Sequence, residues 1–153
     1  QTPQTVSKAL SEMKEEKEKL NDSCDVSKII LASANKFGPS RSDVVFSLDI
    51  DKKNTVFRGS DEMWEAIIDN ILNNFMRYAK SQIKITLKNN KIILYNDGPN
   101  IDKDVLNNIF TPYEKGVRGV FGLGLSIVKK TLGLLNYDIN IENVKNGVKF
   151  IIS

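Results

Sequence analysis

Four polar side chains near the middle of the chain recur at the spacing of a helix. Asn74 follows Asn70 by four positions, and Arg77 and Tyr78 follow Asn74 by three and four, so one helix would carry all four on a single stripe. An amide oxygen is a hard ligand that suits Mg²⁺, and a guanidinium one turn further on can hold phosphate oxygens. Taken alone, such a stripe is more typical of an exposed polar helix face.

A second candidate is the loop at residues 96–100, which reads Asn-Asp-Gly-Pro-Asn and follows a strand-like segment. Gly98 would let the backbone approach a flat ligand closely, and the side-chain oxygen of Asn96 could accept a hydrogen bond from an amino group. By composition alone this segment is an ordinary turn.

A third candidate is the glycine pair Gly122 and Gly124, at the start of a predicted helix. Glycines at this place leave backbone N–H groups bare, and a helix N-terminus with bare amides binds anions. Lys115 and Arg118 in the preceding loop could close over bound phosphates. The spacing fits neither the phosphate loop nor the dinucleotide fingerprint, and Gly-x-Gly alone is a weak signal.

Composition excludes several other kinds of chemistry. The chain has 153 residues, one cysteine and no histidine, so it cannot supply a Ser-His-Asp or Cys-His catalyst or a histidine metal ligand by itself. The single Cys24 is expected to be a small hydrophobe. A net charge of +3, spread evenly, makes nucleic-acid binding unexpected. The apolar stretches are far shorter than the roughly 18 residues that would span a bilayer.

The first segment differs in character from the rest. Charges alternate over residues 5–20 around a sparse apolar stripe, which predicts a solvated helix. This helix is either an ordinary surface helix or the tail of a helical segment of a neighbouring domain. We therefore divide the chain into a linker helix at residues 1–24, expected to end an upstream dimerisation segment, and a domain at residues 25–153.

The elements that must position the candidate residues follow from periodicity and turn chemistry. Turns at Asn89-Asn90 and Asn146-Gly147 predict two tight hairpins, and Ser60 or Asp61 is expected to cap the long helix that carries the asparagine stripe. On that helix, Asp69 and Asn73 are expected to face solvent. Helices are predicted over residues 26–37, 61–79, 102–109 and from 122 onward, and strands over residues 44–50, 56–57, 82–88, 91–95, 137–142 and 148–152. The fold class is α+β, a two-layer sandwich whose mixed, mostly antiparallel sheet carries helices on one face.

Four segments, taken in order, resemble the ATP-binding catalytic domain of sensor histidine kinases. That domain belongs to a superfamily with the ATPases of type II topoisomerases, mismatch repair and large heat-shock chaperones. The asparagine box, first glycine box, phenylalanine box and second glycine box are similar to residues 69–78 (DNILNNFMRY), 96–101 (NDGPNI), 109–113 (IFTPY) and 121–129 (FGLGLSIVK). The resemblance covers roughly residues 25–153 and implies the Bergerat ATP-binding fold.

The resemblance implies roles for the asparagine stripe. Asn74 would ligate Mg²⁺ bridging the triphosphate of ATP, with Asn70 beside it. Arg77 would hold phosphate, and Tyr78 would line the nucleotide site.

The two glycine boxes receive roles in the same way. Asn96 stands where the family usually has the aspartate that reads the adenine amino group, Gly98 would let the base approach, and Ile101 would contact the nucleotide. Residues 111–121 would form a mobile lid over ATP that carries Lys115 and Arg118. Phosphate would be contacted by the backbone amides near Gly122, Leu123, Gly124 and Leu125.

Three positions depart from the family pattern. Asn96 replaces an aspartate and, as a neutral acceptor, makes a weaker bond. Asn100 stands where the second glycine of its box is common, and Val120 stands where the second glycine box often begins with glycine. They suggest either a subfamily variation or a weak or lost nucleotide site.

The resemblance also bears on the reaction. The hydrolases of the superfamily place a glutamate one turn before the Mg²⁺ asparagine, and here that position is Asn70, which cannot take a proton. The domain is therefore expected to bind Mg-ATP, to hydrolyse it poorly and to transfer the γ-phosphoryl group to a histidine on a separate dimerisation domain, through which a response regulator is reached. The alternatives are a nucleotide-binding or pseudokinase interaction module and a serine kinase of the anti-sigma-factor type.

The chain alone is expected not to phosphorylate itself, because it has no histidine. It is expected to be cytoplasmic, without membrane contact of its own, and part of a parent protein anchored in the cell membrane.

Overall fold

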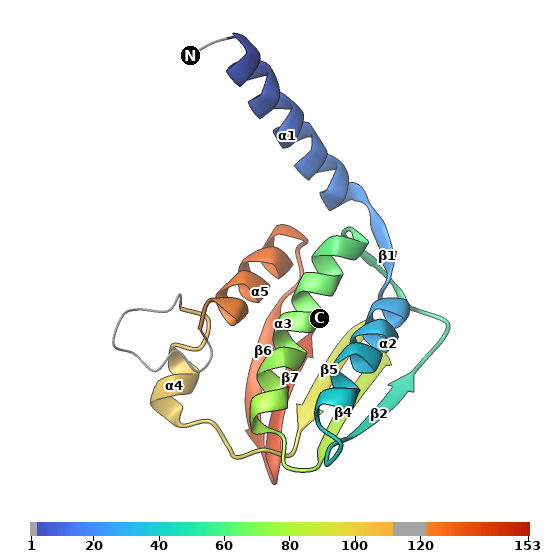
Figure 1. Ribbon diagram of the computed structural model, residues 1–153, viewed down its shortest axis with the longest axis vertical. Helices are drawn as coiled ribbons and strands as arrows, with labels where there is room; N and C mark the ends of the chain where they lie inside the picture. The colour runs from blue at the N-terminus through green and yellow to red at the C-terminus, as the bar shows by residue number, and fades with distance from the viewer. Residues whose placement is uncertain (1–2, 112–121) are drawn as a thin grey trace.

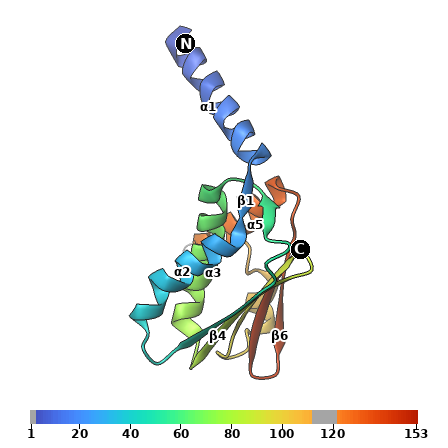
Figure 2. The same cartoon turned by 90° about the vertical axis from the view of Figure 1, so that its right-hand side faces the viewer.

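The helices and strands of the chain separate into two layers. The computed structural model describes residues 3–111 and 122–153. Figure 1 shows α3 between α2 and α5 in one layer, and Figure 2 shows these helices on one side of the sheet. The prediction of an α+β two-layer sandwich is confirmed.

The main sheet has five strands in the order β2-β4-β5-β7-β6. Its β2 runs parallel to β4, and every other neighbouring pair is antiparallel, as predicted for a mixed, mostly antiparallel sheet. The strands are β2 (Val45–Ile50), β4 (Gln82–Lys88), β5 (Lys91–Asn96), β6 (Ile139–Val144) and β7 (Gly147–Ile152).

Both predicted hairpins are present. Asn89 and Asn90 both have positive φ, 54° and 60°, which is the conformation of a type I′ turn. In the second hairpin the prediction was wrong by one residue. Val144 pairs with Gly147, so residues 145–146 form the turn and Gly147 already belongs to the strand.

A small antiparallel ribbon lies apart from the main sheet. It joins β1 (Ser23–Asp25) to β3 (Val56–Arg58). A strand at β3 was expected, but its partner was not, because three residues are too few to display a strand period. The ribbon buries one side chain from each strand, Cys24 and Phe57, and the burial of Cys24 in the core agrees with the expectation that it acts as a small hydrophobe.

The helices begin where their capping residues predict. Ser60 accepts a hydrogen bond from the N–H of Met63 at the start of α3, and Asp25 accepts one from Ser27 at the start of α2; both are standard N-caps. At the far end of α3, the Arg41 guanidinium donates to the carbonyl groups of Met76 and Ala79. The helices are α1 (Pro3–Asn21), α2 (Val26–Phe37), α3 (Asp61–Tyr78), α4 (Lys103–Asn107) and α5 (Gly122–Leu134), with a 3₁₀ turn at Gly38–Ser40.

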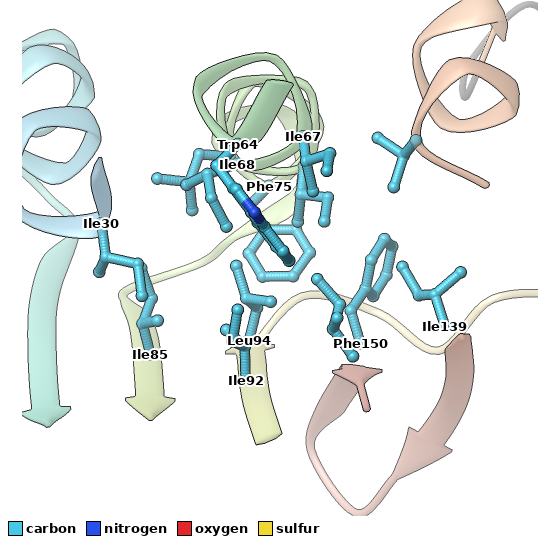
Figure 3. Packing of buried hydrophobic residues seen from close by; sticks show 14 of the residues in the cluster. Ile30, Trp64, Ile67, Ile68, Phe75, Ile85, Ile92, Leu94, Ile139 and Phe150 are labelled. Carbon is cyan, nitrogen blue, oxygen red and sulfur yellow. The ribbon is translucent and has the colours of Figure 1, made fainter. Parts of the chain in front are cut away.

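The core fills the space between α3 and the sheet (Figure 3). Phe75 of α3 meets Phe150 of β7 edge to face, with ring centroids 5.0 Å apart. Trp64 is fully buried and still donates its indole N–H to the carbonyl of Arg58. The apolar face of α3 thus fixes this helix over the centre of the sheet, and with it the asparagine stripe.

The first helix stands away from the sandwich, as Figures 1 and 2 show. Its apolar residues Val6, Leu10 and Met13 are exposed, as the sparse stripe predicted. Within residues 3–111 and 122–153, no helix is both long and apolar enough to cross a membrane.

Candidate nucleotide site

A cavity opens between the C-terminal half of α3 and the sheet, beside the loop that follows β5. It holds about 580 Å³ of space between side chains, part of it open to solvent. Its lining combines three polar side chains with an apolar floor and one loop: Asn74, Tyr78 and Asn96; Val105, Val148 and Phe150; and residues 99–102.

The asparagine stripe of α3 divides between the cavity and its surroundings. Asn74 is 9% exposed and lines the cavity together with Tyr78. Burial raises the pKa of the Tyr78 phenol, so this hydroxyl stays neutral at physiological pH. Arg77 is exposed and does not line the cavity.

Asn70 lies where α3 meets the start of α5. Its amide nitrogen donates to the carbonyl of Ala66, 2.7 Å away, one turn back along the helix. A Cβ added at Gly124 would lie 2.9 Å from Oδ1 of Asn70, so the asparagine oxygen faces the first turn of α5. The structure thereby brings the asparagine box against the second glycine box, about 50 residues later in the chain.

The amide of Asn96 has a defined orientation. Its Oδ1 accepts a hydrogen bond of 2.9 Å from the N–H of Gly98, and a backbone N–H can only donate, so the oxygen must face Gly98. No described residue bonds the opposite Nδ2 group, and every fully buried side-chain N or O atom of the described residues has a partner. Because Asn96 is 4% exposed and lines the cavity, its NH₂ group is open to the cavity.

Gly98 is required by its neighbours in the fold. A Cβ at this position would lie 2.3 Å from the carbonyl oxygen of Tyr78 and 2.7 Å from Oδ1 of Asn96. The glycine therefore lets the loop pass close under the end of α3. The expectation that it admits a flat base stays a prediction.

Asp97 anchors the start of the same loop and was not singled out from the sequence. Its carboxylate accepts hydrogen bonds from the N–H groups of Lys80, Ser81 and Gln82 and from the hydroxyl of Ser81. Burial disfavours its charged form, but these bonds outweigh burial and lower the pKa of Asp97 to about 2. The loop is thus tied to the connection between α3 and β4.

One expectation about α3 is wrong. Asp69 does not face solvent. It accepts a 2.6 Å hydrogen bond from the hydroxyl of Ser33 and forms an ion pair with Lys36, and both partners lie on α2. Packing of α2 against α3 covers this side of the helix. Asn73 is exposed, as expected.

The second glycine box, residues 121–129, lies within the described residues from Gly122 onward. Gly122 and Leu123 form the first turn of α5, and the side chain of Leu125 is buried in the core at 1% exposure. Only its backbone can therefore serve a ligand at the cavity. Lys115, Arg118 and Val120 lie outside the described residues.

Several lining residues were missed by reasoning from the sequence. Val148 and Phe150 form the floor of the cavity because β7 pairs with β5 in a register that sets Val148 opposite Asn96. Their alternation with exposed residues showed that they face inward, but only the pairing register shows what they face. Val105 of α4 gave no comparable signal.

These groups together suit a flat, partly apolar ligand with polar groups at its edge. Apolar side chains offer a slot for a ring, and the amides of Asn74 and Asn96 offer polar contacts at its edge. The described residues contain no cluster of three or more acidic, cysteine or histidine side chains that could hold a metal ion. A metal bound here would need ligand atoms from its partner molecule, as Mg²⁺ does when it binds with phosphates and water.

Comparisons with known proteins relate this chain to a family of ATPases. Residues 59–153 match the family described as "Histidine kinase-, DNA gyrase B-, and HSP90-like ATPase". The sensor histidine kinase CssS of Bacillus subtilis (strain 168) is 38% identical over 118 residues, which cover 74% of this chain and 26% of CssS. The chain spans about a quarter of the length of the curated relatives that it matches.

Solved structures agree in fold. The mycobacterial sensor histidine kinase MprB superposes with a TM-score of 0.75 at 18% identity, covering 86% of this chain and 95% of that one. The catalytic domain of histidine kinase ThkA gives 0.75 at 23% identity, covering 86% and 92%. ThkA in complex with the response regulator TrrA gives 0.70 at 21% identity, covering 97% and 47%.

The family match extends over more than half of the chain and includes all four segments that carry the resemblance. ATP is the nucleotide of this family, and the cavity lies among the matched residues. The chain therefore belongs to the histidine kinase-, DNA gyrase B- and HSP90-like ATPase family, as a catalytic ATPase domain of the sensor histidine kinase kind.

Proposed function

We propose that this domain binds Mg-ATP in the cavity and delivers the γ-phosphoryl group to a histidine on a separate helical domain. The base would enter the slot above Val148 and Phe150, with its edge at Asn96 and with Ile101 and Tyr78 beside it. The triphosphate would then extend along α3 toward the start of α5. The observation that carries the proposal is the contact of Asn70 with Gly124, which joins the asparagine stripe to a helix N-terminus suited to anions.

Asn74 is the residue that would hold Mg²⁺. It lines the cavity, and its side chain makes no hydrogen bond within the described residues, so its amide oxygen is available to a hard cation. Bound Mg²⁺ neutralises charge on the triphosphate. Gly122, Leu123, Gly124 and Leu125 would contribute backbone N–H groups to phosphate, and Arg77, Lys115 and Arg118 would contribute positive charge.

Transfer to histidine is favoured over hydrolysis by the residue one turn before Asn74. Asn70 already donates to Ala66 and has no group that can accept a proton from water,. Phosphoryl transfer depends mostly on positioning and charge neutralisation, so a correctly presented acceptor would suffice. The chain has no histidine of its own, so the acceptor would come from a dimerisation and phosphotransfer domain.

A response regulator is the proposed final partner. The ThkA structure contains the response regulator TrrA, and we propose an equivalent partner for the parent protein, reached through the phosphorylated domain. We also propose that residues 1–24 are the linker from that domain, since α1 stands free of the sandwich with its apolar stripe uncovered.

The function is tested by phosphoryl transfer in a reconstituted mixture. The chain is incubated with ATP labelled at the γ-phosphate, Mg²⁺ and a separately purified helical domain that carries an acceptor histidine. We expect acid-labile phosphate on the helical domain and none on this chain. Acid-stable phosphate on serine would favour the anti-sigma-factor type of kinase, and rapid release of free phosphate would favour a hydrolase.

The pseudokinase alternative is tested by binding alone. Calorimetry with a non-hydrolysable ATP analogue and Mg²⁺ is expected to show saturable binding that weakens strongly in Asn74→Ala. An absence of binding by the unchanged chain would contradict the proposed kinase function.

A further inference from the structure

The loop at residues 97–102 belongs to no helix or strand, and its residues 99–102 line the cavity. Pro99, Asn100 and Ile101 of this loop would face the bound base. A loop is the least rigid way to shape a binding slot, so whatever fixes its position also fixes the shape of the slot. Asp97 fixes its first residue through the connection between α3 and β4.

The other end of the loop is held by the tip of the β6–β7 hairpin. Asn100 uses both hydrogens of its amide, donating to the carbonyl oxygens of Val144 at 3.0 Å and Gly147 at 2.8 Å. These two residues flank the hairpin turn and pair with each other. The departure from glycine at position 100 therefore adds a side chain that closes the loop onto the hairpin.

Asn143 of β6 makes the reciprocal contact. Its Oδ1 accepts from the N–H of Ile101 and its Nδ2 donates to the carbonyl of Ile101, both at 2.8 Å. Both backbone polar groups of one cavity-lining residue are thus paired with a single side chain. No other hydrogen bond to the backbone of Ile101 is formed within the described part of the chain, because this residue lies outside the helices and the strand ladders.

The hairpin can come this close because of a glycine. A Cβ at Gly147 would lie 2.3 Å from the carbonyl oxygen of Asn96 and 2.5 Å from the ring of Tyr95. The hydroxyl of Tyr95 also donates to the carbonyl of Asn146 in the turn, at 2.6 Å. Several contacts therefore hold the hairpin close to the end of β5, where the loop begins.

We propose that Asn100 and Asn143 are positioning residues for the nucleotide: they clamp residues 99–101 to the β6–β7 hairpin and so hold the slot in the shape that accepts the base. The proposal rests on the proposed function, in that the ligand of the cavity is taken to be ATP. Asn100 and Asn143 are both exposed, so their hydrogen bonds lie at the surface of the protein. The loss of these hydrogen bonds leaves no deeply buried group unpaired. Their removal should therefore affect the loop more than the stability of the fold.

The test compares Asn100→Ala and Asn143→Ala with Asn140→Ala in the full chain. Asn140 is an exposed residue of the same strand as Asn143, on the opposite face of the sheet, and no hydrogen bond is formed by its side chain within the described residues. Calorimetry with the ATP analogue AMP-PNP and Mg²⁺ measures affinity, thermal unfolding measures stability, and amide hydrogen exchange measures the opening of residues 97–102.

We expect each clamp variant to bind the analogue about tenfold more weakly, the effect of losing one or two hydrogen bonds. Exchange at residues 97–102 should become faster, while Asn140→Ala matches the unchanged chain in all three measurements. Asn143→Asp keeps the acceptor for the N–H of Ile101 and loses the donor, so its affinity for the analogue should lie between that of Asn143→Ala and that of the unchanged chain.

Two results would overturn the clamp. One is faster exchange of the loop with unchanged affinity, which would mean that loop position does not shape the site. The other is an equal loss of affinity in Asn140→Ala, which would mean that the hairpin acts only through general stability. If the unchanged chain does not bind AMP-PNP, the proposed function itself fails and the clamp proposal fails with it, which separates that outcome from the other two.

Discussion

At the scale of single residues, the orientation of the Asn96 amide bears on which purine the proposed nucleotide site would prefer. Its oxygen is engaged by the N–H of Gly98, and its NH₂ group faces the cavity. An NH₂ group is a donor, and the 6-amino group of adenine is also a donor, whereas the 6-carbonyl of hypoxanthine is an acceptor. Asn96 therefore offers adenine less than an aspartate would at the same place.

The first prediction follows from this polarity. The unchanged chain should discriminate little between ATP and ITP, and Asn96→Asp should shift the ratio of their affinities by about tenfold toward ATP, because a carboxylate accepts from the amino group and repels the carbonyl. Competition of each nucleotide against a fluorescent ATP analogue measures the ratio. Asn73→Asp, which adds the same charge at an exposed position of α3, is the control. A strong preference of the unchanged chain for ATP would contradict the assigned orientation.

A second prediction concerns Asp97 and pH. The pKa of Asp97 in the folded protein, about 2, lies below the ordinary value of 3.8. The charged carboxylate therefore stabilises the fold fully at pH values above 3.8, and this contribution is lost as the pH falls toward 2. Asp97→Asn should lower the free energy of unfolding at pH 7 by about 2 kcal/mol. Urea unfolding at several pH values should show this difference as constant above about pH 5 and shrinking from about pH 4 to pH 2. A difference that does not change with pH would show that the charge of Asp97 is not the cause.

At the scale of elements, the meeting of α3 and α5 depends on a glycine. A Cβ at Gly124 would press against Oδ1 of Asn70, while one at Gly133 of the same helix would have no atom within 4 Å. Substituting alanine at Gly133 therefore tests helix propensity alone, whereas the same change at Gly124 also disturbs the contact with Asn70.

The third prediction uses this pair. Gly133→Ala should stabilise the protein by about 0.5 kcal/mol, because alanine is the better helix former. Gly124→Ala should give no such gain and should weaken binding of the ATP analogue several-fold, because Asn70 must move. Thermal unfolding and calorimetry measure the two effects. A gain in stability at position 124 equal to that at position 133 would contradict the close contact.

At the scale of the whole molecule, the boundary of the folded unit lies near the start of β1. Helix α1 projects from the sandwich (Figure 1), while Cys24 of β1 is buried and Asp25 caps α2. Burial also raises the pKa of the Cys24 thiol to about 12, so this group stays a neutral part of the core. The ribbon of β1 and β3 thus joins the projecting helix to the folded unit.

The fourth prediction compares two truncated chains. Removing residues 1–18 should leave the free energy of unfolding nearly unchanged, because the apolar residues Val6, Leu10 and Met13 of α1 are exposed and bury nothing against the sandwich. Removing residues 1–25 should cost at least about 2 kcal/mol, through the lost ribbon, the lost burial of Cys24 and the lost helix cap. Urea unfolding of both chains measures this, and equal stability would show that β1 contributes nothing.

Much of this molecule could be predicted from local patterns. The wide apolar face of α3, its Ser60 cap and the Asn89-Asn90 turn are all set by residues within a few positions of one another. The order of the four boxes identified the family, and the missing histidine indicated that any acceptor histidine lies elsewhere. These features depend on residue type and short spacing, which a sequence displays directly.

Only the tertiary structure decided how these parts meet. The bond between Ser33 and Asp69 spans 36 positions and the pairing of Asn143 with Ile101 spans 42, and no periodicity encodes such contacts. The pairing register of β5 and β7 set Val148 beneath the site, and the parallel pairing of β2 with β4 was likewise not visible locally. The residues thus determined which chemistry is present, and the packing of distant segments determined which residues share one cavity, because burial is gained by the chain as a whole.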